Sequence, residues 1–274
     1  MKAVIYKKYG TAKNLSYLEV SKPSPKPNEI LVQIKAASLN AADKHLLHGK
    51  PLFMRLAFGL FVPKNQILGV DVAGVVAAVG SDVKQFRVGD EVFADLSLAG
   101  LGGFAEYVCA KAEAFSHKPK NLEFTQAAAV PLAATTALQA LHKGNIVSAQ
   151  NVLIIGASGG VGTFALQLAK AFGAHVTALC SPKKLEQACQ LGADEVLDYH
   201  KTNILKSGKR FDLILDIAAS RGFLEYAPIL SEQGNYVLVG GAFSRIVQVM
   251  LFGGFFSKAT DKKYMGLVAQ SKAA

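Results

Sequence analysis

Residues 151–162 read Asn-Val-Leu-Ile-Ile-Gly-Ala-Ser-Gly-Gly-Val-Gly, an apolar run followed by a glycine-rich segment. The β-branched run Val152 to Ile155 is typical of a central parallel strand, which is buried on both faces and does not alternate. From Thr163 to Phe172 the large apolar residues recur at every fourth position, as they do along one face of a helix. The sequence therefore predicts a strand, a glycine turn and a helix in direct succession.

This succession is suited to binding a pyrophosphate. Free backbone N–H groups and the positive end of a helix dipole attract an anion, and glycines leave room for it to approach. The motif is Ala-x-Gly-x-x-Gly, with Ala157 at the first position, and a plain turn is the alternative reading of such a short pattern. The flanking strand and helix favour the phosphate site. The predicted cofactor-binding residues here are Gly156, Ala157, Ser158, Gly159, Gly160, Val161 and Gly162.

Length and composition indicate a globular protein of two domains. The chain has 274 residues, of which 51% are hydrophobic and 18% charged, so it can bury full cores. The longest apolar runs, near residues 52–62 and 246–256, are shorter than the roughly 20 residues of a membrane-spanning helix. The amino terminus lacks the apolar core of a signal peptide. We expect no membrane span and a cytoplasmic location.

Charge and cysteine content exclude other classes. The net charge is +10, but lysines are scattered, and the one dense group, residues 201–210, has no interleaved aromatic residues. We therefore expect no nucleic-acid partner. The three cysteines lack the Cys-x-x-Cys spacing of a zinc site, and their odd number argues against a disulfide framework.

The remaining pattern predicts an α/β protein with a β-rich first part. Short strand-like segments and turns fill residues 1–120, and two helical segments at 126–130 and 131–141 lead into the second part. There strands alternate with helices, as in a doubly wound parallel sheet. Its six predicted strands are residues 152–155, 174–179, 195–198, 212–216, 236–239 and 264–269.

Several segments, taken in order, resemble the medium-chain dehydrogenase/reductase superfamily and its zinc-free, quinone oxidoreductase-like branch. They are residues 38–43, 68–74, 86–90, 103–107, 127–140, 156–162 and 192–196. The resemblance implies a GroES-like catalytic domain over residues 1–120 and a Rossmann NADP-binding domain with a six-stranded sheet over residues 121–274. Family members continue for several dozen residues more, so it also implies that their C-terminal return segment is absent here.

The resemblance argues against a metal. Zinc-dependent relatives place a cysteine where this chain has Asn40, and His-Glu where it has Val70-Asp71. Neither Asn40 nor Val70 supplies a thiolate or imidazole, the ligands that zinc prefers here. The four-cysteine lobe of those relatives is also missing. We therefore predict no metal.

The residues after the second Rossmann strand favour NADPH. A site for NADH places Asp or Glu there, whereas this chain has Ser181, Lys183 and Lys184. Ser181 and Lys184 can donate to a 2′-phosphate, and Tyr199 matches a family position that holds the same end of the cofactor. The alternative is that both lysines belong to the solvated first turn of a helix.

Other site residues come from the resemblance. Asn40 and Asp43 match an Asn and an Asp near the nicotinamide, and Thr136 matches a threonine beside it. His45 stands where many relatives have Tyr, and its imidazole can donate to a developing enolate oxygen or relay a proton. A helix-surface position is the alternative for His45. Three further predicted cofactor contacts are Ala218, Gly240 and Gly241.

The sequence thus predicts an NADPH-dependent, zinc-independent reductase of quinones, enones or related activated carbonyl compounds. The alternative is a non-catalytic NADPH-binding protein or an inactive truncated homologue. The partner is a small-molecule substrate. The sixth strand, residues 264–269, is the one through which relatives pair, so we also expect a homodimer.

Overall fold

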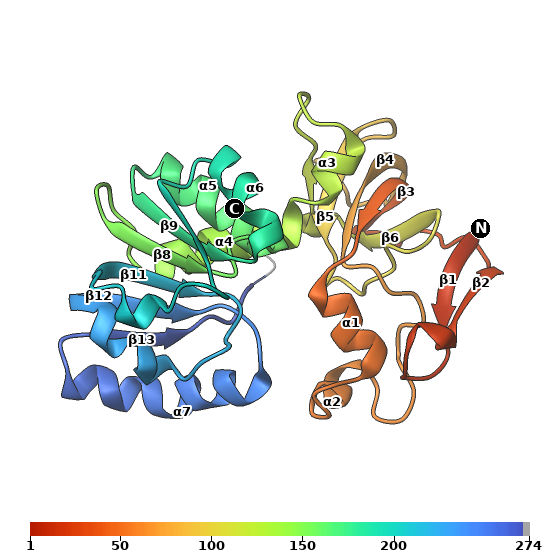
Figure 1. Ribbon diagram of the computed structural model, residues 1–274. Helices are drawn as coiled ribbons and strands as arrows, with labels where there is room; N and C mark the ends of the chain where they lie inside the picture. Colours follow the sequence, from red (N-terminus) through yellow and green to blue (C-terminus); the bar gives the residue numbers. More distant parts are fainter. Residues whose placement is uncertain (271–274) are drawn as a thin grey trace. The chain divides into compact units, whose positions relative to one another are not determined.

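The computed structural model describes residues 1–270, which form two compact units (Figure 1). The first unit is Met1–Leu132 and the second is Ala133–Gln270. The boundary lies within helix α4 (Pro131–Lys143), whereas sequence reasoning placed it after residue 120. Pro131 opens α4 at a position where its missing N–H removes no helical hydrogen bond.

The first unit is built from antiparallel strands. Its main sheet has five strands in the order β6-β3-β4-β5-β7, and a separate pair joins β1 to β2. The strands are β1 (Lys2–Tyr6), β2 (Leu15–Glu19), β3 (Glu29–Ser38), β4 (Asp71–Val79), β5 (Glu91–Asp95), β6 (Tyr107–Lys111) and β7 (Phe115–His117). The helices are α1 (Ala41–His48), α2 (Met54–Phe58) and α3 (Phe124–Ala128), with short 3₁₀ turns at Ala12–Asn14 and Ala112–Ala114.

The second unit contains a parallel sheet of six strands in the order β10-β9-β8-β11-β12-β13, which confirms the predicted doubly wound fold. The strands are β8 (Asn151–Ile155), β9 (His175–Cys180), β10 (Glu195–Asp198), β11 (Phe211–Asp216), β12 (Leu230–Leu238) and β13 (Lys263–Gly266). The α-helices are α5 (Gly160–Ala171), α6 (Leu185–Gln190) and α7 (Phe243–Ala259). The 3₁₀ segments are η3 (Pro182–Lys184), η4 (Ile204–Lys206) and η5 (Phe223–Ile229).

Both faces of this sheet are covered, which explains why Val152 to Ile155 of β8 are all apolar and buried. Val152 and Ile154 belong to the core under α4, α5 and α6. Leu153 and Ile155 point to the opposite face and pack in the core that includes Val249 of α7. Figure 1 shows α7 on one side of the sheet and α5 and α6 on the other. Because successive strand residues face opposite ways, a strand covered on both sides needs apolar residues at every position.

The structure differs from the sequence-based expectation in three elements. The sixth strand, expected over residues 264–269, is β13 and ends at Gly266. Between β11 and β12, where the alternation of strands and helices predicts an α-helix, the chain forms the 3₁₀ segment η5, which contains Pro228, a residue that cannot donate a helical hydrogen bond. Helix α7 is long but has no periodic signal, because its sequence is apolar on nearly every side. Among residues 1–270, no helix has both the length and the apolar character needed to cross a bilayer.

Candidate active site

The glycine turn after β8 has a shape that depends on glycine at two positions. Gly156 has a φ of +82°, a conformation that residues with a Cβ rarely adopt. A Cβ at Gly162 would lie 2.2 Å from the carbonyl oxygen of Gly156 and 2.7 Å from the Cα of Ala157. The start of α5 is therefore pressed against the end of β8, and only glycine fits between them.

The next glycines leave open space over the same turn. Gly159 and Gly160 are exposed. A Cβ at Gly159 would lie 3.5 Å from the carbonyl oxygen of Gly156, and one at Gly160 would lie 3.9 Å from the Cβ of Ala133. The helical ladder begins with Thr163 N donating to Gly159 O at 2.9 Å, so the N–H groups of Gly160 to Gly162 precede it. A bare main chain with free donors at a helix N-terminus fits the pyrophosphate of a dinucleotide.

The other residues of the turn contribute through their backbone. Gly156 N and Ala157 N donate to Leu179 O of β9, at 3.0 and 3.4 Å. Ala157 is buried, while Ser158 and Val161 are half-buried. On α4, Ala133 lies 3.9 Å from the Cβ position of Gly160, and the buried Thr136 follows along the same helix.

The segments after β11 and β12 meet at the same edge of the sheet. The Cβ position of Gly156 is 3.4 Å from the Cβ of Ala218, and that of Gly241 is 2.5 Å from the carbonyl oxygen of Ala218. A Cβ at Gly240 would lie 3.4 Å from the carbonyl oxygen of Ile217. The structure thus places Ala218 beside the glycine turn, and Gly240 and Gly241 beside the segment that contains Ala218, as expected where parallel strands end together.

Asp216 anchors this edge, and sequence reasoning missed it. It is fully buried, accepting from Ala219 N at 2.8 Å and from Tyr236 Oη at 2.8 Å. Burial raises the pKa of its carboxyl. A polar residue at the end of an apolar strand was the available signal, because a buried carboxyl must find partners.

The residues expected to hold the adenosine end lie near one another after β9 and β10. These strands pair in register, with Asp198 opposite Cys180, and Tyr199 N donates to Cys180 O at 3.3 Å. Lys184 N donates to Ser181 O at 2.9 Å, which closes the turn η3. Lys184 and Tyr199 are exposed and Ser181 is half-buried, so a ligand can reach all three.

In the first unit, Asn40 lies in a hydrogen-bonded cluster at the ends of β3 and β4. Its Nδ2 donates to Asp71 Oδ2 at 3.0 Å and to Ser38 Oγ at 3.2 Å. Ser38 Oγ donates to the same carboxylate at 3.3 Å, and Leu132 N of α4 donates to Asp71 Oδ1 at 3.1 Å. Burial raises the pKa of Asp71 to about 7, although the bond from Asn40 opposes this. Sequence reasoning used Asp71 only in the argument against zinc.

Asp43 is placed inside the same domain. Its carboxylate accepts from Asn40 N at 2.8 Å and from Gly69 N at 3.1 Å, and its side chain is buried. Burial raises the pKa of Asp43, while these backbone bonds act to lower it. The contacts make Asp43 the residue that fixes the start of α1, and its predicted contact with substrate stays a prediction.

His45 and His48 both lie on α1. His45 is exposed, and its carbonyl oxygen accepts from Lys50 N at 3.2 Å. His48 Nδ1 lies 2.7 Å from the carbonyl oxygen of Lys44, one turn earlier. The exposed imidazole of His45 is free to meet a ligand, but its predicted role in the reaction stays a prediction.

Two family descriptions match the chain, one in each unit. Residues 26–120 match the alcohol dehydrogenase GroES-like domain, and residues 160–264 match the zinc-binding dehydrogenase family. A chloroplast envelope quinone oxidoreductase homolog of Arabidopsis thaliana is 40% identical over 252 residues, covering 86% of this chain and 74% of that protein. The chain belongs to the medium-chain dehydrogenase/reductase superfamily, in its quinone oxidoreductase-like branch. The predicted membership is confirmed.

Further similar proteins support this assignment to the quinone oxidoreductase-like branch. A mitochondrial NAD(P)H oxidoreductase of Mus musculus is 45% identical over 208 residues, which are 69% of this chain and 52% of that protein. The chain therefore spans about half of that relative's length. The quinone oxidoreductase structure from Coxiella burnetii matches with a TM-score of 0.86 at 30% identity, covering 99% of this chain and 84% of that one. The predicted GroES-like and Rossmann domains are thus confirmed.

Within this superfamily, the residues at the zinc position do not suit the metal. Asn40 offers an amide that is bonded to Asp71, and Val70 is an aliphatic side chain. Among residues 1–270, no three side chains of His, Cys, Asp or Glu come together as metal ligands would.

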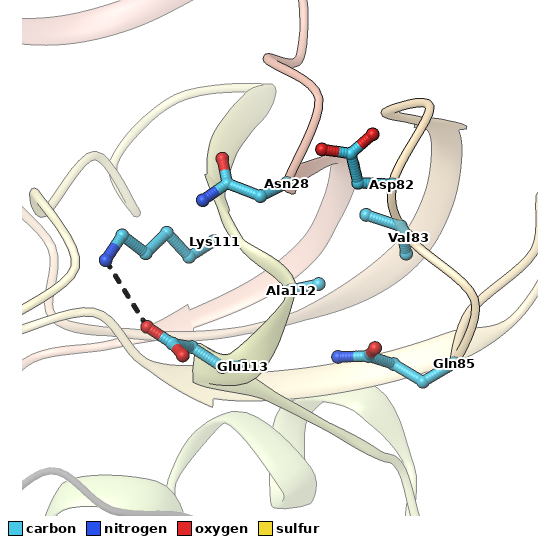
Figure 2. A pocket seen from close by; sticks show the side chains of 7 residues that line it. All are labelled: Asn28, Asp82, Val83, Gln85, Lys111, Ala112 and Glu113. Carbon is cyan, nitrogen blue, oxygen red and sulfur yellow. Dashed lines mark hydrogen bonds and ion pairs between the residues drawn. The ribbon is translucent and has the colours of Figure 1, made fainter.

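A small polar hollow elsewhere in the GroES-like domain is separate from this site. Figure 2 shows it between the turn after β4 and the end of β6. Lys111 and Glu113 on its rim form an exposed ion pair at 3.4 Å. No predicted site residue is part of its lining, which consists of Asn28, Asp82, Val83, Gln85, Lys111, Ala112 and Glu113.

Proposed function

We propose that this quinone oxidoreductase-like protein is an NADPH-dependent, zinc-independent reductase of quinones, enones or related activated carbonyl compounds. The observation that carries the proposal is the glycine turn, which excludes a side chain at Gly162 and leaves bare main chain at Gly159 and Gly160. That combination supports the binding of a dinucleotide pyrophosphate. The names of the relatives support quinone reduction.

The chemistry divides between the cofactor and this chain's residues. Bound NADPH supplies the hydride for the substrate. The Nδ2 of Asn40 donates hydrogen bonds to Asp71 and Ser38 within the domain. The side-chain atom that Asn40 offers to a ligand is therefore Oδ1, a hydrogen-bond acceptor. Asn40 therefore suits a hydroxyl or carboxamide N–H of the cofactor. Polarising a carbonyl requires a donor, and His45 is the candidate.

A single-turnover experiment tests the proposal. NADPH is mixed with excess protein and a small panel of quinones and enals, and absorbance of the reduced nicotinamide is followed. Rapid oxidation with at least one compound supports the reductase. Binding without oxidation would instead favour the non-catalytic NADPH-binding protein, and absence of binding would contradict both.

Replacing His45 by phenylalanine is expected to lower turnover by about tenfold or more, since phenylalanine cannot donate a proton or a hydrogen bond. The exposed position of His45 makes a folding defect a poor explanation of such a loss. His48→Phe is the matched control on the same helix, and we expect little change. Equal turnover in His45→Phe and the wild type would assign His45 to the helix surface.

Reversing the charge of Lys184 is expected to raise the KM for NADPH by about tenfold or more and to leave the KM for NADH nearly unchanged. The reason is that a hydrogen bond to a charged phosphate is worth about 1.5–3 kcal/mol. Lys183→Glu is the matched control, because both lysines lie on the exposed turn η3. The same rise in KM in both variants would indicate an effect of the overall charge of this turn and not a specific contact of Lys184. Equal KM values for NADPH and NADH in the wild type would contradict the preference for NADPH.

The proposal includes a homodimer that pairs through β13. This strand is one of the two edge strands of the sheet, beside β12, and β10 lies at the other edge. An edge strand presents unpaired N–H and C=O groups to a second chain. The oligomeric state in solution tests this part, and the cytoplasmic location stays a prediction.

A further inference from the structure

Asp71 is a buried carboxylate that the proposed reaction does not use. Its side chain is fully buried at the start of β4, where a charged group is costly unless it is bonded. Its donors are the Asn40 amide, the Ser38 hydroxyl and the N–H of Leu132. Ser38 and Asn40 lie two residues apart between β3 and α1, and Leu132 lies in the first turn of α4, so with β4 itself Asp71 joins three segments of the first unit. A group that joins three segments through direct bonds sets their positions relative to one another.

We propose that ionised Asp71 is a positioning residue that fixes the side-chain amide of Asn40 and ties it to the first turn of α4. Its effect on turnover rests on the proposed function, whereas its effect on Asn40 does not. Asn40 is half-buried, so its amide can meet a ligand on one side while Asp71 holds it on the other.

Hydrogen-bond donors and acceptors in the cluster determine how the Asn40 amide is oriented. An ionised carboxylate only accepts, so Asp71 requires the nitrogen of the Asn40 amide to face it and leaves Oδ1 directed elsewhere. A protonated carboxyl carries a donor of its own, which the Ser38 hydroxyl can accept by reversing its role. Oδ2 then no longer holds both Nδ2 of Asn40 and the hydroxyl. The orientation of Asn40 is therefore specified by the ionised form and relaxed by protonation.

The charged groups around Asp71 bear on this equilibrium. Asp95 of β5 is its cross-strand partner in the antiparallel register and is also buried. Its charge raises the pKa of Asp71. Asp43 of α1 is linked to the cluster through the backbone N–H of Asn40. Burial and the charge of Asp95 oppose the ionisation of Asp71, so the bonds from Asn40, Ser38 and Leu132 are what favour the charged form.

The direct test follows the side-chain amide of Asn40 by NMR in the chain without cofactor, with the signal assigned by its loss in Asn40→Asp. We expect the amide shifts to titrate between about pH 5 and pH 9, with a midpoint near that of Asp71. Asp71→Asn, which mimics the protonated form, should abolish the titration. A signal that does not change with pH, or that titrates equally in Asp71→Asn, would overturn the proposal.

Two further variants keep the test valid if Asp71→Asn does not fold. Asp95→Asn removes a like charge and should move the midpoint to lower pH, while Ser38→Ala removes a donor and should move it to higher pH. Opposite shifts support the assignment of the titrating group to Asp71. Shifts of the same sign, or none in either variant, would contradict it.

Kinetics provide the second readout and separate this inference from the proposed function. The pH dependence of kcat/KM should contain a limb with the same midpoint as the amide titration. That limb should be absent in Asp71→Asn and present at lower pH in Asp95→Asn. If the amide follows Asp71 but NADPH is not consumed, the proposed function fails and the positioning role stands. If NADPH is consumed and neither the amide nor the rate depends on Asp71, the positioning role fails.

Discussion

Gly162→Ala is expected to eliminate NADPH binding at ordinary cofactor concentrations, a loss of about a hundredfold or more in affinity. The added Cβ would lie 2.2 Å from the carbonyl oxygen of Gly156, so α5 must move away from β8. That movement displaces the N–H groups expected to contact the pyrophosphate. Overpacking of this kind also lowers the free energy of unfolding, by about 1–3 kcal/mol. Calorimetric titration and thermal unfolding with and without NADPH measure the two effects.

Two other glycine variants serve as controls for Gly162→Ala. Gly160→Ala adds a Cβ that meets only Ala133 at 3.9 Å, so it should retain stability while losing affinity if the phosphate lies there. Gly254→Ala lies on the exposed side of α7 with no atom within 4 Å, and it should change neither property. Undiminished NADPH affinity in both Gly160→Ala and Gly162→Ala would contradict the cofactor site.

Asp71→Asn is expected to become progressively more stable relative to the wild type as pH rises. In the folded wild type the pKa of Asp71, about 7, lies above its ordinary value of 3.8, so protonation favours the folded state. This stabilisation is fully present below pH 3.8 and is lost as pH rises through about 7. At about 1.4 kcal/mol for each pH unit, the total change is about 4 kcal/mol. Asparagine does not ionise, so the variant lacks the dependence.

The measurement is the difference in free energy of unfolding between wild type and variant, from denaturant titrations at a series of pH values. The difference cancels the other titrating groups that both chains share. Asp95→Asn is the control, because it removes the neighbouring charge and should reduce the pH dependence without removing it. If the difference in free energy of unfolding stays constant with pH, the hydrogen bonds to Asp71 fully offset the effect of burial on its pKa, which would contradict the prediction.

The prediction for Gly162 depends on residues close together in the sequence, whereas the prediction for Asp71 depends on residues far apart in it. The glycine turn is encoded within twelve consecutive residues, 151–162, where a strand, a tight turn and a helix N-terminus follow each other. Local patterns of this kind can be interpreted without knowledge of the fold, because their geometry depends on neighbours in sequence. The same holds for the alternation that predicts β8 to β12. Local patterns do not predict α7. Its residues are apolar on nearly all sides, so the sequence does not indicate which side of the helix is buried.

The sequence by itself determined the two-domain α/β architecture, the glycine turn, the lysines after β9 and the absence of zinc-type residues at positions 40 and 70. Only the tertiary structure decided that Ala218 meets the turn and Gly241 meets Ala218, and that Asp71 bonds to residues 31 and 61 positions away. The physical reason is that burial and hydrogen-bond partners depend on which strands end side by side. An aspartate within an apolar strand signals that it needs partners, but only the sheet register supplies them.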